Sequence, residues 1–278
     1  MMIIFRTARP LLLCAALLGG LFGSLWPANA GMTPWVSGEG GRMRLVALNP
    51  DATGRIKAAL QIEPKPGWIT YWREPGNSGI PPQVTVTGSD IRLERVDYPV
   101  PKILSDGKVE DIGYDAPVAL PLTFIATEPS KPAKIEATAF IGICKDICIP
   151  FQAEFSLTLA PVSQSLPEEE TILQSAAALP ESPSIDFAVR GHQLSSDGKQ
   201  LSLQLTVPES GSALPEVIVT GPSGHVFFKQ ENGRRDGKLF ETNIAIGKLP
   251  KNYDIHGKTW GLVVIDGKRA METTLAFD

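Results

Sequence analysis

The sequence has few of the residues that most catalytic and metal sites need. Its 278 residues include three cysteines and three histidines, and the histidines are scattered through the second half of the chain. The chain has no phosphate-binding glycine loop, no zinc-ligand spacing and no internal repeat. It also has no basic cluster, and its formal net charge is −4. We therefore predict no metal site, no cofactor and no nucleic-acid partner.

Long apolar runs are absent beyond the first 30 residues. Within that segment Arg6 and Arg9 precede an apolar stretch from 11 to 26, and Ala28-Asn29-Ala30 has the A-x-A form of a cleavage site. We predict that residues 1–30 are a signal peptide, removed near Ala30, and that the mature protein is periplasmic. An uncleaved membrane anchor is the alternative, but the apolar run is short and broken by glycines.

Helical periodicity is scarce, whereas 24 prolines and 26 glycines interrupt short apolar runs throughout the chain. This pattern favours an all-β protein. We expect two β-domains, over residues 31–160 and 185–278, joined by a linker over residues 161–184. Within the linker, residues 168–179 have moderate helical character, with Ser165 as a possible N-cap.

The two cysteines that would survive cleavage, Cys144 and Cys148, lie between two stretches of strict alternation. Odd positions from 135 to 143 and from 149 to 159 are apolar, and most even positions are polar. Alternation on both sides of Lys145-Asp146-Ile147 predicts a β-hairpin. Both cysteines then fall on the face away from the core, where their Cα atoms can reach the roughly 4.4–6.8 Å that a disulfide requires.

Two interpretations of this pair remain open. In a secreted β-sandwich a disulfide is usually a structural staple. A staple normally points into the core and ties distant strands together, whereas this pair points outward and closes a five-residue loop. The chain-entropy model gives such a loop only ~2 kcal/mol of stabilisation. An accessible bond that stabilises little is a candidate for thiol–disulfide exchange.

An ordered series of motifs resembles a known family. It comprises Gly67-Trp68, Tyr71-Trp72-Arg73, Pro75-Gly76, Ser78-Gly79-Ile80-Pro81-Pro82, Tyr98-Pro99, Pro101, Gly113-Tyr114 and Cys144-x-x-x-Cys148-Ile149-Pro150. This series is similar to the N-terminal periplasmic domain of the DsbD/ScsB thiol:disulfide interchange proteins, and most similar to the ScsB type. The resemblance covers most of residues 35–160. It implies immunoglobulin-like β-sandwiches, the second of which acts as a scaffold or docking domain, and a role linked to cytochrome c biogenesis.

The resemblance also assigns roles to individual residues. Cys144 and Cys148 match the redox-active, catalytic pair, in which Cys148 forms the mixed disulfide with the partner and Cys144 resolves it. Tyr71 and Tyr114 match tyrosines near the pair. Lys145 would favour a thiolate, whereas Asp146 is expected to stabilise the turn.

The chain departs from the family in two respects. The segment 103–107, which contains Leu104, falls where DsbD has a cap loop with a shielding phenylalanine, and it contains no phenylalanine. A shielding cap is therefore in doubt, and we expect Leu104 to line the site instead. The sequence also contains no transmembrane relay and no thioredoxin domain. The resemblance then implies two partners: a separate membrane electron donor with a thioredoxin-like domain, and a periplasmic thioredoxin-fold acceptor.

Three functions from different classes are compatible with the sequence. The first is a protein-disulfide reductase, that is, a domain that relays electrons by thiol–disulfide exchange. The second is copper(I) binding by two soft thiolates, although no methionine or histidine cluster accompanies them. The third is a binding module whose disulfide is structural.

Overall fold

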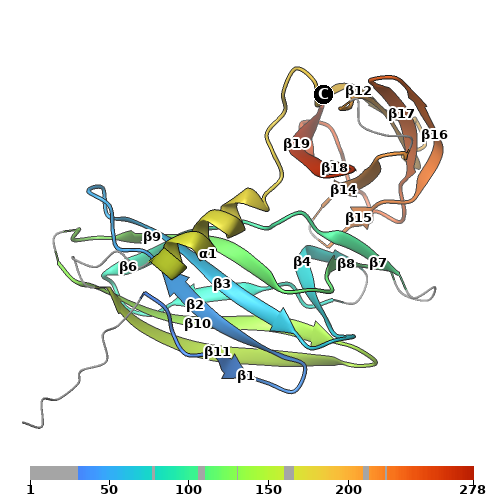
Figure 1. Cartoon of the computed structure of the whole chain (residues 1–278). Coiled ribbons are helices and arrows are strands. Elements are labelled where there is room, and N and C mark those ends of the chain that lie inside the picture. The colour runs from blue at the N-terminus through green and yellow to red at the C-terminus, as the bar shows by residue number, and fades with distance from the viewer. Residues whose placement is uncertain are drawn as a thin grey trace, which may run out of the picture.

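The computed structural model of the chain describes residues 31–76, 79–105, 110–129, 131–159, 166–208, 213–222 and 224–278. The predicted signal peptide, with its cysteine Cys14, lies outside these residues, and so do Ser165 and residues 106 and 107 of the expected cap segment. Among the described residues no helix is long and apolar enough to cross a membrane. Figure 1 shows a chain built almost wholly of strands, with one helix between two groups of sheets.

The first group consists of two antiparallel sheets. One has the order β1-β2-β3-β9-β6 and contains β1 (Val36–Ser37), β2 (Gly41–Ala47), β3 (Arg55–Pro64), β9 (Val118–Ala126) and β6 (Ile91–Val96). The other has the order β11-β10-β4-β8-β7 and contains β11 (Cys148–Leu159), β10 (Ala133–Cys144), β4 (Ile69–Gly76), β8 (Glu110–Tyr114) and β7 (Lys102–Ser105). The short strand β5 (Gln83–Val86) pairs with β10 beyond the end of β4.

The second group is a smaller pair of four-stranded antiparallel sheets. The first sheet contains β12 (Ala188–Leu194), β13 (Gln200–Thr206), β17 (Leu239–Ala245) and β16 (Gln230–Asp236). The second contains β15 (Val226–Phe227), β14 (Glu216–Thr220), β18 (Lys258–Asp266) and β19 (Arg269–Phe277). The all-β fold of two sandwiches expected from the sequence is confirmed.

Alternation along the strands accounts for the core of each sandwich. In β10 the odd positions from Ala133 to Ile143 are buried, and in β11 Phe151, Phe155 and Leu157 alternate with exposed polar residues. These side chains pack against apolar residues of β2, β3 and β9. Burial of apolar area at roughly 25 cal/mol per Å² is the main source of stability in such a core.

The helix α1 (Leu166–Ala177) covers the outer face of the first sheet, as Figure 1 shows. It begins two residues before the expected segment and ends two residues before its end. Ile172 is buried against Val46 and Ala59, whose side chains point away from the sandwich core. A helix in the predicted linker therefore belongs structurally to the first sandwich.

The second sandwich packs against β4 of the first. Arg73 forms an ion pair with Glu272 of β19, and the Gly224 amide donates to Glu74 Oε2 at 3.1 Å. Ile218 and Val263 are fully buried in the same apolar cluster as the first core. Polar and apolar contacts thus both join the two sandwiches at β4.

Where the chain enters the second sandwich, Arg269 donates hydrogen bonds to the carboxylates of Glu181 and Asp186 at 2.7 Å each. These bonds hold the pKa values of both acids below their usual range. Acids with lowered folded-state pKa values stabilise the protein above their unfolded pKa values, and this contribution is lost as the pH falls through the folded values.

We therefore expect Arg269→Gln to lower the melting temperature more at pH 6 than at pH 2. At pH 6 the variant leaves two ionised acids without their cation. At pH 2 the unfolded chain binds protons on these acids, so their contribution to stability is already reduced and the arginine matters less. Calorimetry of both proteins over this pH range measures the difference. An equal loss at both pH values would show that Arg269 acts through packing against Phe187, over whose ring it lies at 5.5 Å, rather than through charge.

Candidate functional site

The hairpin β10–β11 brings the two cysteines together at its tip. The strands pair in continuous antiparallel register from Ala133↔Leu159 to Cys144↔Cys148. Residues 145–147 form the turn, in which the Lys145 amide donates to the Ile147 carbonyl at 3.2 Å. Cys144 and Cys148 form a disulfide with their Cα atoms 4.1 Å apart. The turn and the alternation on both sides are as the sequence predicts.

The two cysteines differ in exposure. Cys144 is 3% exposed, whereas Cys148 is exposed to solvent. The cause is their place in the sheet: β11 is an edge strand, while β10 continues to β4 through the pair Cys144↔Ile69. The sequence predicted both cysteines to be accessible, and this is wrong for Cys144, because β4 lies against it. Of the two cysteines, Cys148 is therefore the one that a partner can reach from the edge of the sheet.

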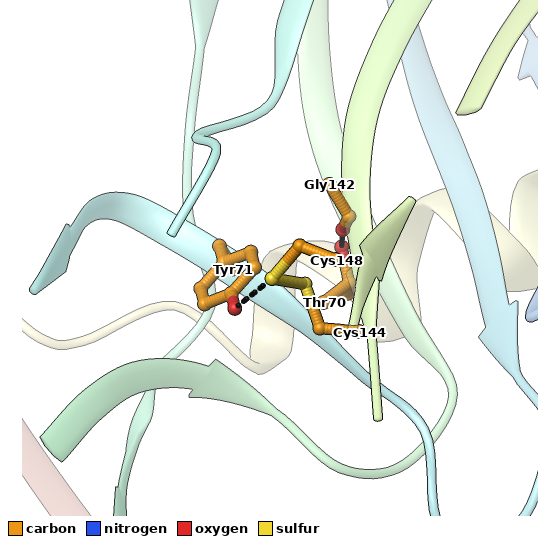
Figure 2. Close-up of a disulfide and its surroundings, with 5 residues drawn as sticks. All are labelled: Thr70, Tyr71, Gly142, Cys144 and Cys148. Atoms are coloured by element: carbon orange, nitrogen blue, oxygen red, sulfur yellow. Dashed lines mark hydrogen bonds between the residues drawn. A yellow bond between two sulfur atoms is a disulfide. The ribbon is translucent and has the colours of Figure 1, made fainter. Parts of the chain in front are cut away.

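Tyr71 lies directly against the disulfide. Its hydroxyl is 3.1 Å from Cys148 Sγ, and the side chain is 1% exposed (Figure 2). Because Tyr71 and Thr70 are adjacent on β4, they point to opposite faces of the sheet. Thr70 Oγ1 donates to the Gly142 carbonyl at 2.9 Å and fastens β4 to β10.

Two glycines make room for the Tyr71 ring. A Cβ atom on Gly79 would lie 2.4 Å from Tyr71 Cδ1, and one on Gly142 would lie 2.7 Å from the Ile80 Cβ and 3.1 Å from Tyr71 Cδ2. The Gly142 amide donates to the Ile80 carbonyl at 3.3 Å. The segment around Gly79 and Ile80 therefore covers the tyrosine on the side away from the core. This segment shields Tyr71, and through it one side of the disulfide.

Asp111 of β8 completes the polar surroundings of the tyrosine. Burial raises the pKa of Tyr71 to about 12, and the charge and hydrogen bond of the Asp111 carboxylate act in the same direction. Asp111 is itself 9% exposed. Asp111 is not among the site residues predicted from the sequence. It stands two residues before Gly113, which pairs with Tyr71, and this pairing becomes visible only in the folded sheet.

The other predicted site residues, Lys145 and Leu104, lie in the turn and on β7. Lys145 is exposed in the turn, and a Cβ atom on Gly67 would lie 3.7 Å from its Cε. Leu104 is half-buried and is the cross-strand neighbour of Asp111, which places it on the side of the sheet with the acid. Residues 106 and 107 of the expected cap segment lie outside the described residues.

Tyr114 does not reach the disulfide. It pairs with Thr70, so it lies on the core face, opposite to Tyr71. Its hydroxyl donates to the Pro99 carbonyl at 2.8 Å, and burial raises its pKa far above the usual range. Within the described residues, no group of three or more His, Cys, Asp and Glu could hold a metal ion.

Comparisons with known proteins identify what this arrangement is similar to. Residues 43–160 match the family model of the N-terminal domain of the thiol:disulfide interchange protein DsbD. Among solved structures, the N-terminal periplasmic domain of ScsB from Proteus mirabilis superimposes with a TM-score of 0.72 at 21% identity, covering 90% of this chain and 100% of that chain. None of the curated proteins matches the chain.

The geometry predicts an effect of Asp111 on the reactivity of Cys148. A carboxylate near a thiol disfavours the thiolate, so removing its charge should lower the thiol pKa. In a Cys144→Ala background, we expect Asp111→Asn to shift the pH midpoint of Cys148 alkylation downward by roughly one unit. Asp115→Asn is the matched control, because Asp115 pairs with Lys102 at 2.7 Å. Equal midpoints for all three proteins would mean that Asp111 does not act on the sulfur.

Proposed function

We propose, from the match of residues 43–160 to the family model of DsbD N-terminal domains, that the chain relays electrons between thioredoxin-fold proteins in the periplasm. The matched segment is a thiol:disulfide interchange domain, and it contains the disulfide Cys144–Cys148. In this proposal residues 31–160 carry out the exchange. Residues 185–278 are a scaffold or docking domain, joined through the linker 161–184.

The observation that carries the proposal is the unequal exposure of the two cysteines. A donor thiolate can approach the exposed Cys148 Sγ but not Cys144, which is 3% exposed. Attack forms a mixed disulfide with Cys148 and releases Cys144 as a thiolate, which takes up a proton. The second thiol of the donor then attacks the donor's own sulfur in that bond. The donor leaves as a disulfide, and this protein holds two reduced cysteines.

Delivery to the acceptor reverses these steps. The Cys148 thiolate attacks the acceptor disulfide and forms a mixed disulfide, while one acceptor sulfur leaves as a thiolate. Cys144 then attacks Cys148 Sγ, which restores the intramolecular disulfide and releases the acceptor as a dithiol. Two electrons pass in each cycle, and no cofactor is needed.

The surroundings of Cys148 fit such an encounter. Ile147, beside it in the turn, is 68% exposed and offers an apolar contact to a partner. Tyr71 closes the other side and is a positioning residue, because its hydroxyl lies 3.1 Å from Cys148 Sγ. We propose that the electron donor is a separate membrane protein with a thioredoxin-like domain, and that the signal peptide is cleaved near Ala30 on export to the periplasm.

Trapping of mixed disulfides tests the assignment of the two cysteines. We expect Cys144→Ala to accumulate a covalent complex with an oxidised thioredoxin-fold protein, because Cys148 attacks but nothing resolves the bond. Cys148→Ala should form essentially none, since the remaining thiol is buried. Non-reducing electrophoresis of each variant with the same partner measures this. Complexes formed by Cys148→Ala but not by Cys144→Ala would reverse the roles.

The reduction potential of the pair separates an exchanging disulfide from a staple. In a glutathione or dithiothreitol redox buffer, we expect a value of roughly −180 to −270 mV, as for thioredoxin-like exchange proteins. A structural disulfide would lie below about −300 mV. A potential in that lower range would exclude the relay and leave a binding function for the chain.

A further inference from the structure

A buried carboxylate lies far from the disulfide, beneath the helix that covers the first sheet. Glu168 is in the first turn of α1 and is 2% exposed. Among the buried side-chain oxygens and nitrogens of the described residues, Glu168 Oε2 is the one without a hydrogen-bond partner. An ionised carboxylate without a partner is strongly unfavourable in the interior of a protein. The position therefore requires a cation or a donor.

Gly31 lies next to this carboxylate. A Cβ atom on Gly31 would be 3.6 Å from Glu168 Cγ. The Gly31 nitrogen is bonded to the Cα atom from which that Cβ atom would project, which places it in the neighbourhood of the Glu168 side chain. No side chain fits at position 31, because that Cβ atom would lie 2.0 Å from the Ala47 carbonyl oxygen.

The chain after Gly31 is firmly held in this place. The Ala47 amide donates to the Gly31 carbonyl at 2.6 Å, and Met32 forms a β-bridge with Val46. Thr33 is joined to Leu45 by two hydrogen bonds, of 2.9 and 3.0 Å. Residues 31–33 thus extend the pairing of β2, and the position of the Gly31 nitrogen is fixed by backbone bonds.

The other nearby cation is already engaged. Arg44 interacts electrostatically with Glu168. However, Arg44 Nε donates to Gln61 Oε1 at 2.6 Å, and its guanidinium lies 4.4 Å from the centre of the Trp35 ring. The described ion pairs do not include one between Arg44 and Glu168. The guanidinium therefore supplies a favourable field, but not a hydrogen bond to Oε2.

We propose that the partner of Glu168 is the α-ammonium group of Gly31, created when the Ala30–Gly31 peptide bond is hydrolysed. One water molecule is consumed, Ala30 leaves with a carboxylate, and Gly31 gains an amino group that is protonated at neutral pH. Before cleavage the same nitrogen is an uncharged amide. Removal of the predicted signal peptide thus generates the charge that the buried carboxylate lacks, and it ties the first residues of the mature chain to α1.

Amine reactivity tests this pairing directly. The protein is exported with its own leader, purified and treated with an acetylating reagent at neutral pH, and the N-terminal peptide is quantified by mass spectrometry. We expect the chain to begin at Gly31 and its amine to react at least about ten-fold more slowly in the native protein than in Glu168→Gln, because an ion-paired ammonium is a poor nucleophile. The exposed Lys57 serves as the internal reference and should react equally in both.

Glu169→Gln is the matched control, because Glu169 is exposed in the same turn of α1. It should leave the reactivity of the Gly31 amine unchanged. A mature chain that begins elsewhere, or equal reactivity in wild type and Glu168→Gln, would overturn the proposal. Neither result would bear on the redox function, which trapping tests separately.

A second measurement remains available if Glu168→Gln does not fold. A chain that retains one additional residue before Gly31 moves the ammonium away from Glu168 and leaves the carboxylate intact. We expect its melting temperature to fall by about 5 °C or more. Where Glu168→Gln does fold, the two changes should not be additive. An extended chain as stable as the mature one would contradict the pairing.

Discussion

The antiparallel pairing of β4 with β10 is the constraint on which the site depends. At one end of β4 the pairs Ile143↔Thr70 and Cys144↔Ile69 place the strand beside the disulfide. The alternation of β4 then sends Trp72 into the core and Tyr71 to the face of the sulfurs. The far end of β4 meets the second sandwich through Arg73 and Glu74. One short strand therefore fixes the disulfide, its tyrosine and the position of the second sandwich.

The same pairing makes the disulfide asymmetric. In a hairpin at the edge of a sheet, the inner strand has neighbours on both sides and the outer strand on one side only. Here Cys144 is on the inner strand and Cys148 on the edge. The order of attack in a thiol–disulfide exchange depends on which sulfur a partner can reach. In this chain sheet topology, rather than a difference in local sequence, distinguishes the two cysteines.

How much the sequence could predict depends on how far apart along the chain the interacting residues are. The hairpin depends on alternation within some 25 neighbouring residues, and it was predicted residue by residue. Burial of Cys144 depends on a strand that lies more than 70 positions earlier. The Asp111–Tyr71 contact depends on a pairing that shifts register between Tyr71 and Gly76. Tyr114 was misplaced for a related reason, because its face is set by its pairing with Thr70 and not by its distance in sequence from the cysteines.

The tyrosine between a carboxylate and a sulfur also bears on the redox chemistry. A phenol has one proton, and the raised pKa of Tyr71, about 12, keeps that proton in place at neutral pH. If the hydroxyl donates to Asp111, it leaves the Cys148 sulfur without a donor, and a thiolate there gains little stabilisation. A thiol of higher pKa is a stronger nucleophile once ionised, but a poorer leaving group. In the proposed relay, this arrangement would favour attack by Cys148 on an acceptor disulfide over release of Cys148 from one, which is the direction that delivery of electrons to an acceptor requires.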